Sequence, residues 1–468
     1  MPPNRTRVRC QLLGERAAYG AVARERISCQ KSGARRSHVK PPQRGGVRMT
    51  AEVAIVNRHA IALAADSAVT VGRERVWKYA NKLFSLGPHN DIGVMIYNSA
   101  DFVGIPWETI VKEFRRHCAD THFITVSDAA VHFIDFIKSN RFKNDKEEFE
   151  SFARLIVNIT YEIESAVKFK TYKEFNTNLE KYITDAMAAI TKTPADFSFD
   201  RGTFVSTFKQ AVKGICKEAF KHKPNEQLNT KLCEYMFEWI SRKKISEFSS
   251  GIVFAGYGRE EFLPAVLRYE VDGRALACVR VWERQSLNYN LVPGRQADTG
   301  GAIIPFAQSD MLQLFMEGIS GNYLRYLRKA IRELLKKKSE AMVDAFVSDV
   351  KARPAEKTKQ EAENKVINDE LFAEFSKYRN KSLIEQTLKT VNSLPKEEMA
   401  AMAEALVELT ALRRKLGPTL ESVGGPVDVA IISKGDGFIW IKRKHYFKAE
   451  TNLDFSIRKN LATKGVSP

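Results

Sequence analysis

After residue 50 the chain begins with alternating apolar positions, the pattern of a half-buried strand. Residues 51–56 alternate in this way, and residues 60–65 form a second apolar run. The polar residues 57–59 separate the two runs, so the sequence predicts a β-hairpin. Two more strands are expected at residues 83–86 and 92–97.

Helical periodicity replaces this alternation from residue 107 to about residue 245. A helix is expected at residues 107–117, directly after Pro106, because proline is favourable in the first turn of a helix. Further on, apolar residues recur at three- and four-residue steps, which indicates one buried helical face. These residues are Phe152, Leu155, Ile156, Ile159, Ile163 and Val167.

Strand character returns at residues 251–258. A hairpin is expected next, with strands at residues 265–271 and 275–282. Its turn is predicted at Asp272-Gly273, since Asp-Gly is a strong signal for a tight turn.

The last third of the chain is mainly helical and closes with strands. The expected elements are helices at residues 309–319, 322–335 and 399–415 and a hairpin at residues 427–433 and 437–442. Residues 351–365 are charged and poor in apolar residues, so we expect a linker or an exposed loop there. The apolar face of the 399–415 helix is expected to carry Met402, Leu406, Leu409 and Leu412.

Runs of strands and runs of helices, rather than strict alternation, indicate an α+β architecture. The expected segments are a basic leader or misassigned upstream segment (1–49), the N-terminal part of the core (50–117), a helical insertion (118–248), core strands and a helix (249–319), a helical insertion with a charged linker (320–398), a C-terminal core helix and hairpin (399–447) and a basic tail (448–468).

The net charge of +18 is concentrated near the start of the chain. Residues 1–48 contain twelve Arg or Lys residues and only two acidic ones, Glu15 and Glu25. A basic surface on the rest of the protein is therefore weakly supported, and nucleic acid is not an expected partner.

Residues 1–48 also lack helical or strand periodicity. A disordered tail, a propeptide, a targeting leader and upstream sequence joined by a misplaced start codon all fit this composition. We favour the misplaced start, because Met49-Thr50 would then be an ordinary translation start whose methionine is removed before a small residue.

The cysteines suggest a reducing compartment. Six are scattered without a C-x-x-C pair, namely Cys10, Cys29, Cys118, Cys216, Cys233 and Cys278. Disulfide frameworks and metal sites need tighter or patterned spacing, so we expect reduced thiols and no metal. No run of eighteen apolar residues and no secretory signal is present. A cytoplasmic protein without a membrane partner or a cofactor is the resulting prediction.

Candidate chemistry lies between Met49 and Asn98. A threonine hydroxyl is a poor nucleophile and needs a base, which the α-amino group of an N-terminal threonine can supply. That amine titrates at about 7.7–8.0 in model compounds. A nearby ammonium lowers the pKa values of the amine and the hydroxyl, and a carboxylate holds the ammonium in place. Thr50, Lys82 and Asp66 are the candidates for these three groups.

This stretch resembles the β subunits of proteasomes and their bacterial relative of the HslV type, which are N-terminal-nucleophile (threonine) hydrolases. Their opening pattern is a threonine, a hairpin ending in Ala-Ala-Asp-Ser, a threonine four residues after that Asp, and a lysine on the next strand. The matching residues are Thr50, Ala64-Ala65-Asp66-Ser67, Thr70 and Lys82. The match covers Met49 to Asn98 well and the later strands only in outline.

The resemblance implies a four-layer αββα sandwich of the N-terminal-nucleophile hydrolase type, with large helical insertions. It makes Thr50 the nucleophile with its α-amino group as base, Lys82 the residue that tunes this pair, and Asp66 the residue that orients Lys82. Thr70 would hold the substrate backbone in an extended pose.

The resemblance also implies supporting groups. The backbone N–H of Asn98, at the start of the first long helix, would form the oxyanion hole, and asparagine tolerates the left-handed backbone better than other non-glycine residues. Ser309, Glu421 and Ser422 are the candidates for distal support. Val423 stands where the family has a serine.

The leading hypothesis is a threonine-type peptidase or amidase that cleaves peptide or other amide bonds through Thr50 after removal of residues 1–49. A small-molecule amidase on the same fold and a catalytically silent assembly or binding protein are the alternatives. The resemblance further implies a peptide or amide substrate and a homo-oligomer, and it leaves an ATPase partner open.

Overall fold

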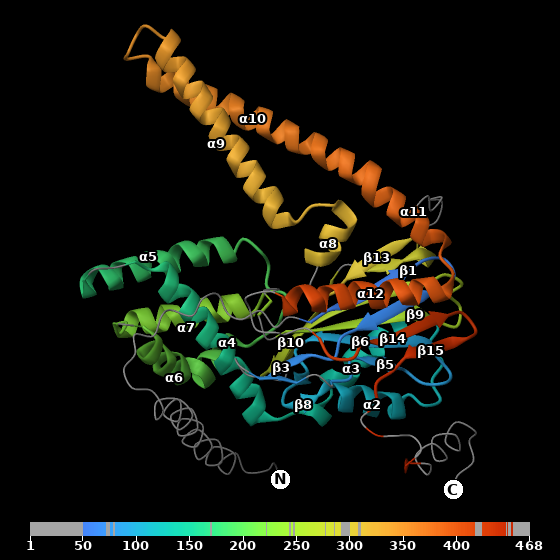
Figure 1. The fold of residues 1–468 in the computed structure, drawn as a ribbon. Coiled ribbons are helices and arrows are strands. Elements are labelled where there is room, and N and C mark those ends of the chain that lie inside the picture. The colour runs from blue at the N-terminus through green and yellow to red at the C-terminus, as the bar shows by residue number, and fades with distance from the viewer. Residues whose placement is uncertain are drawn as a thin grey trace, which may run out of the picture.

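The structure, a computed structural model, combines helices and β-sheets (Figure 1). It describes residues 50–452 apart from 72–74, 78–79, 169–170, 221, 243–244, 247–248, 277, 285, 292–299, 308–309, 417–423, 446 and 448–450. Among these described residues, no helix is long and apolar enough to cross a membrane.

The first sheet is antiparallel and contains the predicted opening and closing hairpins. Its strands are, in spatial order, β13 (Ala302–Pro305), β1 (Glu52–Val56), β2 (Ile61–Ala65), β14 (Asp428–Ser433) and β15 (Gly437–Lys442). Glu52 pairs with Ala65 on β2, and Ala65 pairs with Asp428 on β14. The start of β1, the end of β2 and the start of β14 therefore lie side by side at one end of the sheet.

The second sheet is also antiparallel. Its strands are, in spatial order, β11 (Cys278–Glu283), β10 (Ala265–Ala275), β9 (Ser250–Tyr257), β6 (Asp91–Asn98) and β5 (Leu83–Ser85), with β12 (Leu287–Asn288) pairing with β10. Two small ribbons accompany the sheets, β3 (Val69–Val71) with β4 (Arg75–Trp77) and β7 (Asp101–Phe102) with β8 (Ile105–Pro106).

Helices make up most of the remaining described chain. They are α2 (Trp107–His117), α3 (Val126–Lys138), α4 (Asp145–Ala166), α5 (Tyr172–Ile190), α6 (Arg201–Ala219), α7 (Glu226–Ile240), α8 (Asp310–Glu317), α9 (Gly321–Phe346), α10 (Arg353–Arg379), α11 (Glu385–Ser393) and α12 (Lys396–Lys415). Short turns η1 (Asn140–Phe142) and η2 (Tyr289–Leu291) and the π-helical turn η3 (Asn380–Ile384) complete them.

A hydrophobic cluster joins the two sheets. Ala54, Val56 and Leu63 from the first sheet pack with Met95 and Val253 from the second. On the outer face of the first sheet, a second cluster packs β1 and β2 against α12. The alternation along β1 therefore divides its side chains between these two clusters, as the pleat of a strand requires.

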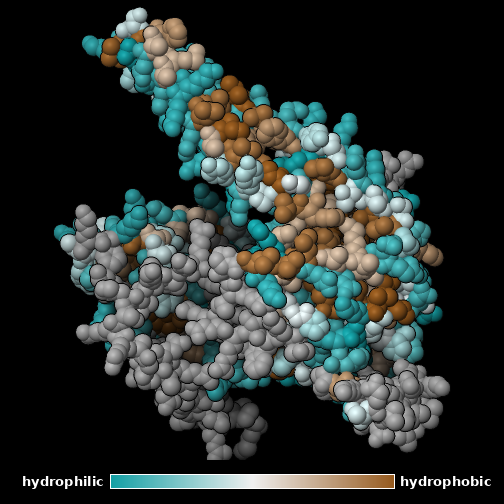
Figure 2. Space-filling model, viewed as in Figure 1, coloured by the Kyte–Doolittle hydropathy of each residue, from teal (hydrophilic) through white to brown (hydrophobic). Residues whose placement is uncertain are grey.

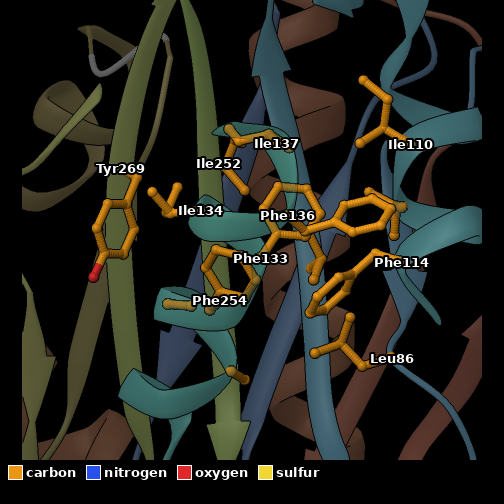
Figure 3. Close-up of a cluster of buried hydrophobic side chains, with 14 of the residues drawn as sticks. Leu86, Ile110, Phe114, Phe133, Ile134, Phe136, Ile137, Ile252, Phe254 and Tyr269 are labelled. Carbon is orange, nitrogen blue, oxygen red and sulfur yellow. The ribbon is translucent and has the colours of Figure 1, made fainter. Parts of the chain in front are cut away.

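Helices α2 and α3 cover the outer face of the second sheet. Figure 3 shows Phe114 and Phe133 from these helices beside Phe254 of β9, and all three belong to one buried cluster. Helix α3 begins at a capping box, in which the side chains of Thr125 and Asp128 each accept the other's backbone N–H. Such a box satisfies two N–H groups that the helix leaves unpaired.

Helices α4 to α7 form a separate hydrophobic cluster of their own, built around residues such as Phe152, Phe175, Phe204 and Leu232. The apolar face predicted from Phe152 to Val167 lies inside it. This group contains no strand among the described residues, so its stability comes from helix-on-helix packing.

The prediction of a charged linker or exposed loop at residues 351–365 is wrong, because residues 353–365 form the first half of α10. Alanine, glutamate, lysine and glutamine are strong helix formers, and α10 packs along α9 through the Arg328–Asp369 ion pair and a buried Asn364–Ser339 hydrogen bond. The two helices project from the sheets as an arm, and Figure 2 shows hydrophobic residues along it.

Two further expectations need correction. The turn predicted at Asp272-Gly273 is instead a bulge within β10, because Ser246 and Arg280 bind the buried Asp272 carboxylate. In α12, Leu409 and Leu412 are exposed, whereas the buried face includes Ala400 and Ala403. Small alanines allow the helix to approach the alanine-rich strand β2 closely.

Candidate active site

Thr50 lies directly before β1 and is only 2 % exposed. Its hydroxyl donates a hydrogen bond of 2.9 Å to Oε2 of Glu52. The hydroxyl is therefore held next to a carboxylate, which is the kind of partner that can accept its proton.

Asp66 follows the end of β2 and is completely buried. Backbone N–H groups of Ala51 and Gly424 donate to its two carboxylate oxygens at 3.2 Å and 2.9 Å. The backbone N–H of Asp66 donates in turn to the carbonyl of Ala51. These bonds fix the carboxylate beside the residue that follows Thr50.

Lys82 precedes β5 and reaches the same place from the second sheet. Its Nζ donates to Oδ1 of Asp66 at 2.5 Å and to Oε1 of Glu52 at 2.9 Å. Burial lowers the pKa of Lys82, but the charges and hydrogen bonds of Asp66 and Glu52 outweigh burial and raise it above its usual value. Lys82 is therefore a fixed ammonium shared by two carboxylates.

The pKa of Glu52 is also raised, which favours its neutral form. Complete burial raises its pKa from 4.5 to about 7, against the charge of Lys82, and the charge of Asp66 adds to the increase. One ammonium cannot fully compensate two buried carboxylates. Glu52 therefore exchanges its proton near neutral pH.

Asn98 ends β6 and does not begin a helix, since the next helix along the chain, α2, starts at Trp107. Its φ is 65°, in the left-handed region. Its backbone N–H is directed at Oγ1 of Thr50 across 3.5 Å. The structure thus brings Thr50, Asp66, Lys82 and Asn98 together.

The remaining predicted site residues are Thr70, Ser309, Glu421 and Ser422. Thr70 lies on β3 opposite Val76, and its side chain is outside the described part of the structure. Ser309, Glu421 and Ser422 lie outside the described residues. Their supporting roles remain predictions.

Sequence reasoning missed Glu52 and gave Gly424 no role. Glu52 did carry a signal, because it lies on the face of β1 that otherwise bears Ala54 and Val56 and faces the second sheet. A charged residue on an apolar face needs a partner, and Lys82 is that partner. The Gly424 contact had no comparable signal, since a backbone N–H binds Asp66 across a long sequence separation.

A neighbouring ion pair extends the row of charges. Asp428 lies across β2 from Glu52, and Lys444 binds it through both its backbone N–H and its Nζ. Burial lowers the pKa of Lys444 despite the contact with Asp428, and the charge of Lys82 lowers it further.

Comparison with known proteins gives little direct guidance. No protein-family model and no curated protein matches the chain. Similar solved structures include the Anbu (Gly-1) mutant from Hyphomicrobium sp. strain MC1, with a TM-score of 0.26, 9 % identity, and coverage of 90 % of this chain and 98 % of that one. Anbu (ancestral beta-subunit) from Yersinia bercovieri has a TM-score of 0.25 and 9 % identity, covering 89 % of this chain and 98 % of that one. Scores this low support no inference about fold or activity.

The prediction that the chain is a member of the proteasome β-subunit and HslV-type family is therefore wrong, because no model of that family matches it. The resemblance rested on a few residues at the edge of one hairpin and the next strand. Adjacent strands bring such residues together in any sheet of this kind, so their spacing alone does not define a family.

Proposed function

We propose that the protein is an amide hydrolase in which Thr50, freed as the N-terminal residue by removal of residues 1–49, is the nucleophile. Its substrates are peptide or other amide bonds. The observation that supports this most strongly is the hydroxyl of Thr50 hydrogen-bonded to a buried carboxylate while the N–H of Asn98 is directed at the same oxygen.

The chemistry is acyl transfer. Oγ1 of Thr50 attacks the carbonyl carbon of the amide, and the C–N bond breaks after the amine nitrogen receives a proton. The resulting ester on Thr50 is then hydrolysed by water. A nearby N–H stabilises the negative oxygen that forms in each step, and such a donor is worth about 3 kcal/mol in the transition state.

Asp66 and Lys82 act as positioning residues in this proposal. Lys82 supplies a fixed positive charge beside the reacting hydroxyl, and Asp66 holds Lys82 with the help of Gly424. We also propose that the two sheets and their flanking helices form a four-layer αββα sandwich. The clusters between the sheets and on each outer face support this arrangement.

Covalent labelling tests the proposal without knowledge of the natural substrate. A chain beginning at Thr50 is incubated with a small alkyl β-lactone, which acylates a reactive hydroxyl by ring opening. We expect one adduct per chain, mapped to Thr50 by peptide mass spectrometry, and no adduct in Thr50→Ala. Thr50→Ser is the matched control that keeps the hydroxyl and should still be labelled. An adduct elsewhere, or none at Thr50, would refute the proposed function.

A further inference from the structure

The carboxylate of Glu52 accepts the hydrogen bond that the hydroxyl of Thr50 donates. Oε2 accepts the hydroxyl hydrogen at 2.9 Å, and Oε1 accepts from Nζ of Lys82 at the same distance. The Glu52 side chain is completely buried and lies on the face of β1 that is directed at the second sheet. Its two oxygens therefore have different partners.

We propose that Glu52 is the general base that takes the proton from the hydroxyl of Thr50, a role that the α-amino group would otherwise fill. This inference rests on the proposed function, since it assigns a step of the same reaction. The α-amino group remains available to bind the substrate or the attacking water.

The environment of Glu52 suits this role. Lys82 and Asp66 face it directly, and the Asp428–Lys444 pair lies across β2. On the β13 side, the N–H of Phe306 donates to the Glu52 carbonyl, and Arg268 reaches the carbonyl of Phe306. With these neighbours burial holds the pKa of Glu52 at about 7, and a base is most effective when its pKa lies near the working pH.

In each half of the reaction, one proton moves to Glu52 and one proton leaves it. As the Oγ–C bond forms, the hydroxyl proton moves to Oε2 of Glu52 and the carbonyl electron pair moves onto its oxygen, near the Asn98 N–H. When that pair returns, the C–N bond breaks and the proton passes from Glu52 to the leaving nitrogen. In the second half, Glu52 takes a proton from the attacking water and returns it to Oγ1 of Thr50.

The test measures the rate of β-lactone labelling at Thr50 from pH 5 to pH 9 in chains that begin at Thr50. Glu52→Gln keeps the shape of the side chain and removes its basicity. We expect labelling to slow at least about 100-fold and to lose its midpoint near pH 7, because general bases contribute about 10²- to 10⁴-fold. A Glu52→Gln chain with the rate and midpoint of the unaltered protein would overturn the inference.

Glu270→Gln is the matched control. Glu270 is also buried, and it also binds a hydroxyl and a cation, those of Tyr97 and Arg268. Its replacement should leave both the labelling rate and the midpoint unchanged. If Glu52→Gln does not fold, Glu52→Asp decides: a slower rate with a retained midpoint supports the inference, and an unchanged rate contradicts it.

The temperature dependence of the midpoint gives an independent test on the unaltered chain. A carboxyl group ionises with almost no enthalpy, whereas an ammonium ionises with a large one. The midpoint should therefore stay constant between 10 and 40 °C if Glu52 is the base, and it should fall on warming if the α-amino group is. The second result would remove Glu52 and leave Thr50 as nucleophile, whereas failure to label Thr50 at any pH would remove both.

Discussion

Two buried glutamates on facing sheets bind the same kinds of group and differ in two respects. Glu52 on β1 accepts from the Thr50 hydroxyl and Lys82, and Glu270 on β10 accepts from the Tyr97 hydroxyl at 2.7 Å and from Arg268 at 3.0 Å. Lys82 also forms an ion pair with Asp66. Of these two cations, Lys82 is therefore the one that two carboxylates share, whereas Arg268 pairs with Glu270.

The second difference is the hydroxyl itself. The oxygen of Tyr97 accepts a hydrogen bond from Nε of Arg268 while donating to Glu270. Burial and the charge of Glu270 raise the pKa of Tyr97 well above its usual value, so the phenol keeps its proton. We therefore interpret Glu270, Tyr97 and Arg268, called the Glu270 group below, as structural. The proposed reactivity of Thr50 depends instead on two buried carboxylates, Glu52 and Asp66, that share one ammonium.

The largest difference is expected when the cation beside each glutamate is removed, Lys82 beside Glu52 or Arg268 beside Glu270. Lys82→Met leaves two buried carboxylates uncompensated, which is expected to lower the free energy of unfolding by about 3–5 kcal/mol and to abolish β-lactone labelling. Arg268→Met should cost less, because its side chain is 27 % exposed, and should leave labelling intact. Urea denaturation and mass spectrometry measure the two effects. Equal labelling in both variants would erase the distinction.

The pH dependence of stability should come from Glu52. A rise of its pKa from 4.5 to about 7 on folding corresponds to roughly 3 kcal/mol, because each pKa unit is worth about 1.4 kcal/mol. The folded state holds a proton that the unfolded state releases above pH 4.5, so this stabilisation is complete below that pH and is lost as the pH rises through 7. Urea denaturation of unaltered and Glu52→Gln chains from pH 4.5 to 8 should show the loss only in the former. The same change of unfolding free energy with pH in both chains would contradict the assignment to Glu52.

Gly251 should matter for the Glu270 group alone. Tyr97 crosses Gly251 to reach Glu270, and an added Cβ would lie 1.7 Å from the Tyr97 ring. Gly251→Ala is expected to lower the free energy of unfolding by about 1–3 kcal/mol through overpacking. Gly214→Ala on α6 is the matched control, since nothing lies within 4 Å of its added Cβ. It should stabilise the chain slightly in thermal unfolding, by up to about 1 kcal/mol.

The smallest expected effect concerns the backbone of Asn98, whose φ of 65° is strained for residues with a Cβ. Asn98→Gly should keep the labelling rate within a few-fold and change stability by less than about 1 kcal/mol. Asn98→Val should be destabilised and labelled more slowly, because a β-branched residue resists this conformation. Equal labelling of both variants would show that the position of this N–H does not matter.

The sequence predicted the elements at the site better than the details of the site. The apolar pattern predicted β1, β2, β5 and β6, because these strands are largely buried. It did not reveal that Glu52 faces Thr50 and Lys82, since that contact depends on how two sheets pack. The same limit explains the wrong turn at Asp272-Gly273, where a tertiary ion pair overrides a local signal.

Thr50 is proposed to react as a free N-terminal residue, and the mass of the active protein shows whether it does. The full chain is expressed, fractions are assayed with a mixture of peptidyl aminomethylcoumarin amides, and the intact mass of each active fraction is measured. We expect amide-cleaving fractions to contain chains that begin at Thr50, and we expect a Thr50→Ala chain with the same N-terminus to be inactive. Activity in chains that retain residues 1–49 would contradict this expectation.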